Sequence, residues 1–136
     1  MDFAIIPVLV IGLVLAFLEL IFVHQDERGM GWLKHGFHAI PTMFVFVFIS
    51  MNITFVLGLV GWQNTLWITI GVRVLVGIVA MVKISAAAAV AGRVGEKFPH
   101  TLAIAALIMV APFIWESVLC AIPFIKTLPM NGCPVA

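Results

Sequence analysis

An arginine inside a long apolar segment is the first residue of this sequence that needs a chemical explanation. Arg73 lies in the run 66–92, LWITIGVRVLVGIVAMVKISAAAAVAG, in which hydrophobic side chains predominate. A guanidinium does not lose its proton in a protein, and placing it at membrane depth costs at least about 2.5 kcal/mol unless a polar group or water accompanies it. The other segments must therefore supply a partner or a wet cavity for Arg73.

Four histidines form a second group with chemical potential, because neutral imidazole is a common ligand of metals and of haem. They are His24, His35, His38 and His100. His35 and His38 are three residues apart and can share one face of a helix. The sequence lacks the H-E-x-x-H and Cys/His spacings that are typical of metal sites, so polar anchoring at a membrane interface is the alternative interpretation.

Two cysteines near the end of the chain, Cys120 and Cys133, can either form a disulfide or remain free thiols. The twelve residues between them include two prolines and a glycine. In an oxidising compartment a bond would hold the C-terminal tail against the preceding helix. A free Cys120 buried in that helix is equally compatible with the sequence. Neither cysteine belongs to a C-x-x-C motif, which argues against thiol exchange chemistry.

The composition indicates a membrane protein. The chain has 136 residues, of which 64% are hydrophobic and 10% charged, and its mean hydropathy is +1.26. Soluble domains are about half apolar and about a quarter charged, so this chain could not cover itself with a polar surface. Its apolar runs are continuous rather than alternating, which favours helices over a β-barrel. A net charge of +1 argues against a nucleic-acid partner.

We predict an all-α fold with one domain, residues 1–136. A helix that crosses the hydrocarbon core needs about 20 apolar residues, and the sequence has room for four such helices in an antiparallel bundle. The predicted transmembrane spans are 3–23, 37–60, 66–91 and 99–120. The proline-rich tail 123–136 should not be helical.

The basic residues determine the expected orientation in the cell membrane. Lysines and arginines are concentrated in the connections between the first and second spans and between the third and fourth. The turn 61–65 has none. Because cytoplasmic connections carry an excess of basic residues, we expect both charged connections in the cytoplasm and both termini outside. All four histidines then lie on the cytoplasmic side.

With this topology, polar residues of different spans can be compared in depth. At about 1.5 Å of rise per residue, Arg73, Glu116 and Asn52 occupy overlapping depths. We expect an Arg73–Glu116 ion pair with Asn52 nearby, because each charge alone would be costly in the membrane. Glu19 and Lys83 both lie near the inner boundary and are expected to pair as well. Such contacts can hold the helices together, form an ion or substrate pathway, or contact another subunit.

Two stretches of the sequence resemble a known family. They are 22–41, FVHQDERGMGWLKHGFHAIP, and 81–101, MVKISAAAAVAGRVGEKFPHT. Both are similar to a small helical accessory subunit of the archaeal ammonia monooxygenase complex, a membrane-bound copper monooxygenase. The resemblance implies a subunit that packs against the catalytic subunits and has no copper ligands of its own. Copper would then be held by the partner subunits.

We therefore expect a non-catalytic accessory subunit of a multi-subunit membrane oxidoreductase complex. Its partners would be other integral membrane subunits and lipid, and it would have no cofactor of its own. One alternative is a small homo-oligomeric channel or transporter that uses Arg73, Glu116 and Asn52. A second alternative is a haem- or metal-binding electron carrier that uses the histidines.

Overall fold

The computed structural model describes residues 3–26, 31–91, 97–128 and 133, without the side chains of residues 31–33, 35 and 87–91. Within these residues every regular element is helical. The long helices are α1 (Ile5–Asp26), α2 (Gly31–Met51), α4 (Leu66–Ala91) and α5 (Phe98–Ser117). The short elements are α3 (Ile53–Leu59), the 3-10 helix η1 (Leu119–Ala121) and α6 (Pro123–Lys126).

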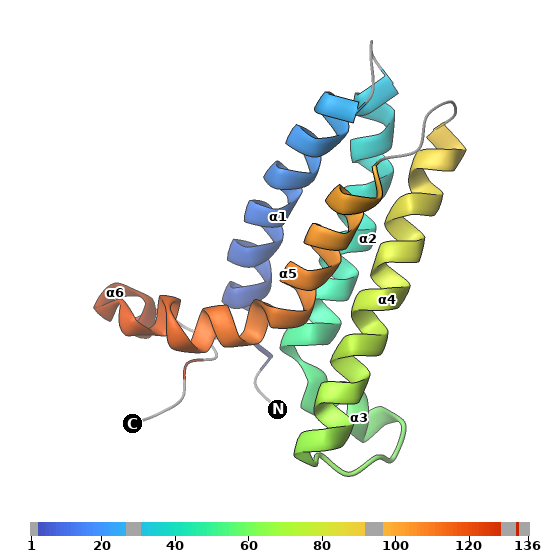
Figure 1. Ribbon diagram of the computed structural model, residues 1–136. Helices are drawn as coiled ribbons and strands as arrows, with labels where there is room; N and C mark the ends of the chain where they lie inside the picture. Colours follow the sequence, from blue (N-terminus) through green and yellow to red (C-terminus); the bar gives the residue numbers. More distant parts are fainter. Residues whose placement is uncertain (1–2, 27–30, 92–96, 129–132, 134–136) are drawn as a thin grey trace.

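The four long helices lie side by side, and α6 extends across their direction (Figure 1). Helix α2 contacts α1, α4 and α5, whereas the described parts of α1 and α4 do not contact one another. The buried core between these helices is apolar and includes Met43, Ile84, Ile108 and Trp115, each fully shielded from solvent. α2 and α5 therefore provide the contacts that connect the outer helices.

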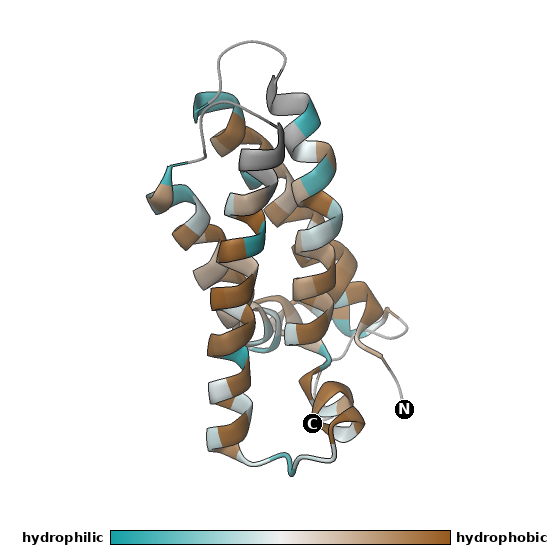
Figure 2. Ribbon diagram, turned by 90° about the vertical axis from the view of Figure 1, so that its right-hand side faces the viewer, coloured by the Kyte–Doolittle hydropathy of each residue, from teal (hydrophilic) through white to brown (hydrophobic). Residues whose placement is uncertain are grey.

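The two ends of this group of helices differ in character. The last turn of α1 and the first turn of α5 lie at one end, which we call the charged end (Figure 1). Residues 61–65 lie at the other, which we call the hairpin end. Hydrophilic residues gather toward the charged end, while most of the remaining helical residues are hydrophobic (Figure 2). This distribution is the one expected for helices that cross a lipid bilayer.

Three helical segments in the described part of the chain are long and apolar enough to cross a membrane. They are Ile5–Asp26, Leu66–Ala86 and Phe98–Ala121. A further segment consists of two pieces, Gly36–Met51 and Ile53–Leu59, with a bend of 86° between them. The chain therefore has three candidate spans, or four if the bent pair is one span. By length and composition these helices support an integral membrane protein whose described elements are all helical.

The bend at Asn52 differs from the uninterrupted helix predicted over 37–60. The Asn52 side chain donates from Nδ2 to the carbonyl oxygen of Phe48 at 3.1 Å, and its Oδ1 accepts from the backbone N–H of Ala4 at 2.8 Å. Asparagine side chains compete for backbone groups and so favour helix ends. Helix α2 accordingly ends one residue before Asn52, and α3 begins one residue after it.

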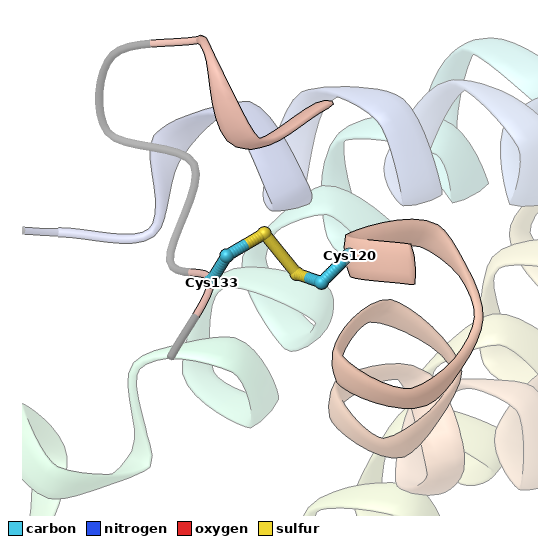
Figure 3. The surroundings of a disulfide bond; sticks show 2 residues. All are labelled: Cys120 and Cys133. Atoms are coloured by element: carbon cyan, nitrogen blue, oxygen red, sulfur yellow. A yellow bond between two sulfur atoms is a disulfide. The ribbon is translucent and has the colours of Figure 1, made fainter. Parts of the chain in front are cut away.

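The C-terminal segment also differs from its prediction. Residues Pro123–Lys126 form α6, so the predicted non-helical tail is wrong at this turn. Proline is tolerated in the first helical turn because its missing N–H has no partner there. A disulfide joins Cys120 in η1 to Cys133, with 5.7 Å between the Cα atoms (Figure 3). The bond therefore holds residue 133 beside the end of α5.

Candidate functional site

Arg73 lies at the contact between α4 and α5, on the outside of the helix group. Its Cζ atom is 5.3 Å from the centre of the Phe113 ring, so the guanidinium makes a cation–π contact with α5. Its Nε atom is buried and has no hydrogen-bond acceptor among the described residues. An arginine inside a membrane usually faces the bundle interior or pairs with an acceptor. Arg73 is unusual because it lies on the outside of the helix group and because its Nε has no acceptor among the described residues.

The Arg73 side chain borders a groove with a volume of about 260 Å³. The other lining residues are apolar and come from both helices: Ile70, Val74, Ala106, Met109, Val110 and Phe113. Val74, Val110 and Phe113 are 44%, 42% and 52% exposed. The groove is therefore open toward the surroundings of the protein and does not lead into its core. We call it the α4–α5 groove.

Glu116 lies on α5 one turn beyond Phe113 and is exposed. Its carboxylate attracts the Arg73 guanidinium electrostatically, but the two side chains do not form a direct ion pair in the described structure. The Asn52 side chain bonds to Ala4 and Phe48 rather than to either of these residues. The structure thus places Arg73 and Glu116 near each other, without the close contact and without the asparagine that the sequence predicts.

Glu19 and Lys83 do not form the expected pair in the part of the chain that the structure describes. Glu19 is fully buried on α1, whereas Lys83 is exposed on α4, a helix that does not contact α1. The prediction compared the depths of the two residues and could not include the arrangement of the helices. Other polar groups inside the bundle join neighbouring helices. The Ser50 hydroxyl on α2 donates to the carbonyl oxygen of Ile108 on α5 at 2.7 Å.

A second polar cluster lies at the charged end, where α1 ends and α5 begins. The Asp26 side chain is 1% exposed. Its Oδ2 accepts from the backbone N–H of Lys97 at 3.0 Å and lies 2.6 Å from Nδ1 of His100. The Lys97 ammonium is 2.8 Å from Oδ1, and the Phe22 ring stacks on His100 at 4.4 Å. We call these residues the Asp26 cluster.

The Asp26 carboxylate lies at the start of α5, a place that favours an anion. It accepts from the backbone N–H of Lys97, the residue that precedes the first turn of α5.

Sequence reasoning missed the Asp26 cluster because its members are about seventy residues apart in the chain. A local signal exists in the stretch 97–100, KFPH, where a proline in the first helical turn marks the start of a helix. Helix starts leave unpaired N–H groups and attract acidic side chains. The sequence does not indicate which acidic residue binds there.

The candidate metal-ligating histidines whose side chains are described, His24, His38 and His100, do not form a group that could hold a metal ion. His38 is exposed, and its Nδ1 lies 2.9 Å from the carbonyl oxygen of Lys34. His24 is exposed at the end of α1, His100 belongs to the Asp26 cluster, and the His35 side chain lies outside the described residues. No group of three or more histidine, cysteine, aspartate or glutamate residues in the described part of the chain could hold a metal ion.

Comparisons of the chain with protein-family models, curated proteins and solved structures found no match.

Proposed function

We propose that this chain is a non-catalytic accessory subunit of a multi-subunit membrane oxidoreductase complex of the ammonia monooxygenase type. In this proposal the bent pair α2–α3 is one span, and the chain crosses the cell membrane four times as an antiparallel bundle. Both termini lie outside the cell. Other integral membrane subunits surround the bundle together with lipid, and these subunits hold the copper.

The observation that carries the structural role is the use of buried polar side chains for helix-to-helix contacts. Ser50, which is fully buried, donates from α2 to a backbone carbonyl oxygen of α5. Asn52, which is 8% exposed, accepts from the N–H of Ala4, immediately before α1. Interhelical hydrogen bonds of this kind stabilise the packing of membrane helices. They are what a subunit with a supporting role requires.

The assignment to an oxidoreductase complex rests on the resemblance of the stretches 22–41 and 81–101. Part of each stretch lies at the charged end, and the Asp26 cluster combines residues of both, because Phe22 and Asp26 come from the first and Lys97 and His100 from the second. The two stretches therefore meet in space.

The proposal can be tested by affinity purification of the tagged chain from its native membranes in a mild detergent. Heterologous integral membrane subunits should co-purify in a fixed ratio, and copper should remain with those subunits when the tagged chain is separated from them. An unrelated tagged protein with four spans serves as the control for non-specific capture. Recovery of the chain without heterologous subunits would contradict the proposal. A Soret band in the purified chain would favour the haem carrier.

A further inference from the structure

Two opposite charges at the α4–α5 groove, Arg73 and Glu116, do not contact each other directly in the described structure. Arg73 contacts the face of Phe113, and its Nε lacks an acceptor among the described residues. Glu116 is exposed on the same side and acts on Arg73 without direct contact. Inside a membrane, lipid chains offer neither group a hydrogen bond, so a group that could complete both is strongly favoured.

Arg73 and Glu116 lie at similar depth along the helix group. Phe113, which contacts Arg73, precedes Glu116 by one helical turn, or about 5 Å. Side chains of a helix lean toward its N-terminus, so the Arg73 side chain leans toward the hairpin end, where α4 begins. α5 ends toward the same side of the helix group (Figure 1). This lean therefore brings the guanidinium closer to the level of Glu116.

Equal depth matters for the association of two copies. Copies that insert in the same orientation can be related by a two-fold axis only if the axis is normal to the membrane, and each residue then keeps its depth. In such a pair, residue i of one copy contacts residue j of the other, and the reverse contact also forms. Arg73 and Glu116 satisfy this condition because they have opposite charges and share one outward side.

The apolar lining of the groove supplies the rest of a contact surface. Val74, Val110 and Phe113 are each about half-exposed around Arg73, and Ala106 is small enough to permit close approach of another helix. A lipid phosphate is a poorer candidate for the same place. Arg73 lies seven residues into α4, about 10 Å from the hairpin end of the helix, below the level of the headgroups.

We propose that two copies of this chain associate through the α4–α5 groove, with Arg73 of each copy paired to Glu116 of the other. The contact does not depend on the proposed function, because a larger complex can contain the chain as a pair. In this contact, the Glu116 carboxylate of the second copy is the acceptor for each Arg73.

The test uses the full chain in bacterial membranes that lack other candidate subunits. Two copies with different affinity tags are co-expressed, and the fraction of one copy that is captured with the other is measured. Arg73→Glu in both copies, or Glu116→Arg in both copies, should lower the captured fraction about tenfold by placing like charges in contact. Lys83→Glu, which reverses an exposed cation of α4 outside the groove, should leave the fraction unchanged.

The decisive measurement combines the two charge reversals in different copies. A copy with Arg73→Glu and a copy with Glu116→Arg restore opposite charges at both contacts, so capture should return to the wild-type level. If the charges pair within one chain instead, capture should recover when both reversals are in the same chain but not when they are in different copies. That result would overturn the proposal, as would wild-type copies that are not captured together.

Neutral variants cover the case in which charge reversal prevents membrane insertion. Arg73→Gln and Glu116→Gln should each lower the captured fraction, while the amount of inserted protein stays at the wild-type level. Unchanged capture for both variants would also overturn the proposal.

Discussion

The Asp26 cluster and the α4–α5 groove compensate charge in different ways. The Asp26 side chain is almost completely shielded from solvent. It is surrounded by a backbone N–H, an ammonium and an imidazole from α5 and the residue before it. Arg73 has an aromatic face on one side and an open groove on the other. Both Asp26 oxygens have partners in the same chain, although Oδ1 meets the Lys97 ammonium in an ion pair without a hydrogen bond. Arg73 Nε has no acceptor among the described residues.

This difference separates the stability of the chain from its association. A charge whose partners all belong to the same chain stabilises the fold, because breaking the set leaves buried groups unsatisfied. A charge on an open surface at membrane depth contributes little to the fold and favours contact with another polypeptide. The two regions should therefore respond differently to substitution.

The largest effect is expected at Asp26. Asp26→Ala removes the acceptor of three groups, and we expect the free energy of unfolding to fall by about 3 kcal/mol. Unfolding of the detergent-solubilised chain by sodium dodecyl sulphate, followed by loss of helical circular dichroism, measures this change. Asp26→Asn keeps an oxygen for the Lys97 N–H and should lose less. Wild-type stability in the alanine variant would show that the cluster does not hold α1 to α5.

Arg73 should behave in the opposite way. Arg73→Met replaces an incompletely paired charge by an apolar chain of similar length, and the free energy of unfolding of the isolated chain should change by less than about 1 kcal/mol. The same unfolding measurement tests this expectation. The capture of a second copy should fall in this variant. A stability loss as large as that of Asp26→Ala would mean that Arg73 is paired inside the chain.

The smallest effect is expected at Lys97, and it sharpens the description of the Asp26 cluster. The Lys97 side chain is 65% exposed, and ion pairs with exposed groups contribute little, so Lys97→Ala should cost about 0.5 kcal/mol. The backbone N–H of residue 97 still reaches Asp26 in this variant. An unfolding free energy as low as that of Asp26→Ala would instead assign the main role to the ammonium.

Hydropathy predicted the long helices well, because an apolar run of sufficient length leaves a membrane chain few other structures. The span 66–91 agrees with α4, Leu66–Ala91. The break at Asn52 was not predicted, since it depends on one side chain that bonds to a backbone group before α1. The turn Pro123–Lys126 was missed because prolines were interpreted as helix breakers throughout the tail.

The sequence predicted the level of Arg73 and Glu116 along the helices, but not the side of the helices on which they lie. Counting residues from the predicted turn placed Arg73 and Glu116 at similar levels, and their electrostatic attraction in the structure agrees with this. Their outward position could not be predicted, because apolar residues predominate around both α4 and α5 and no hydrophobic stripe marks the side toward the core. Prediction of the Asp26 cluster would require knowing that the end of α1 and the start of α5 are neighbours.

The bond between Cys120 and Cys133 provides an independent record of how the chain is inserted. Such bonds persist outside the cytoplasm, whereas cytoplasmic thiols are kept reduced. Alkylation of intact cells before lysis, followed by mass measurement, distinguishes a bonded pair from two labelled thiols. A bonded pair would place the hairpin end and α6 on the outer side, and two labelled thiols would indicate that the chain is inserted the other way round.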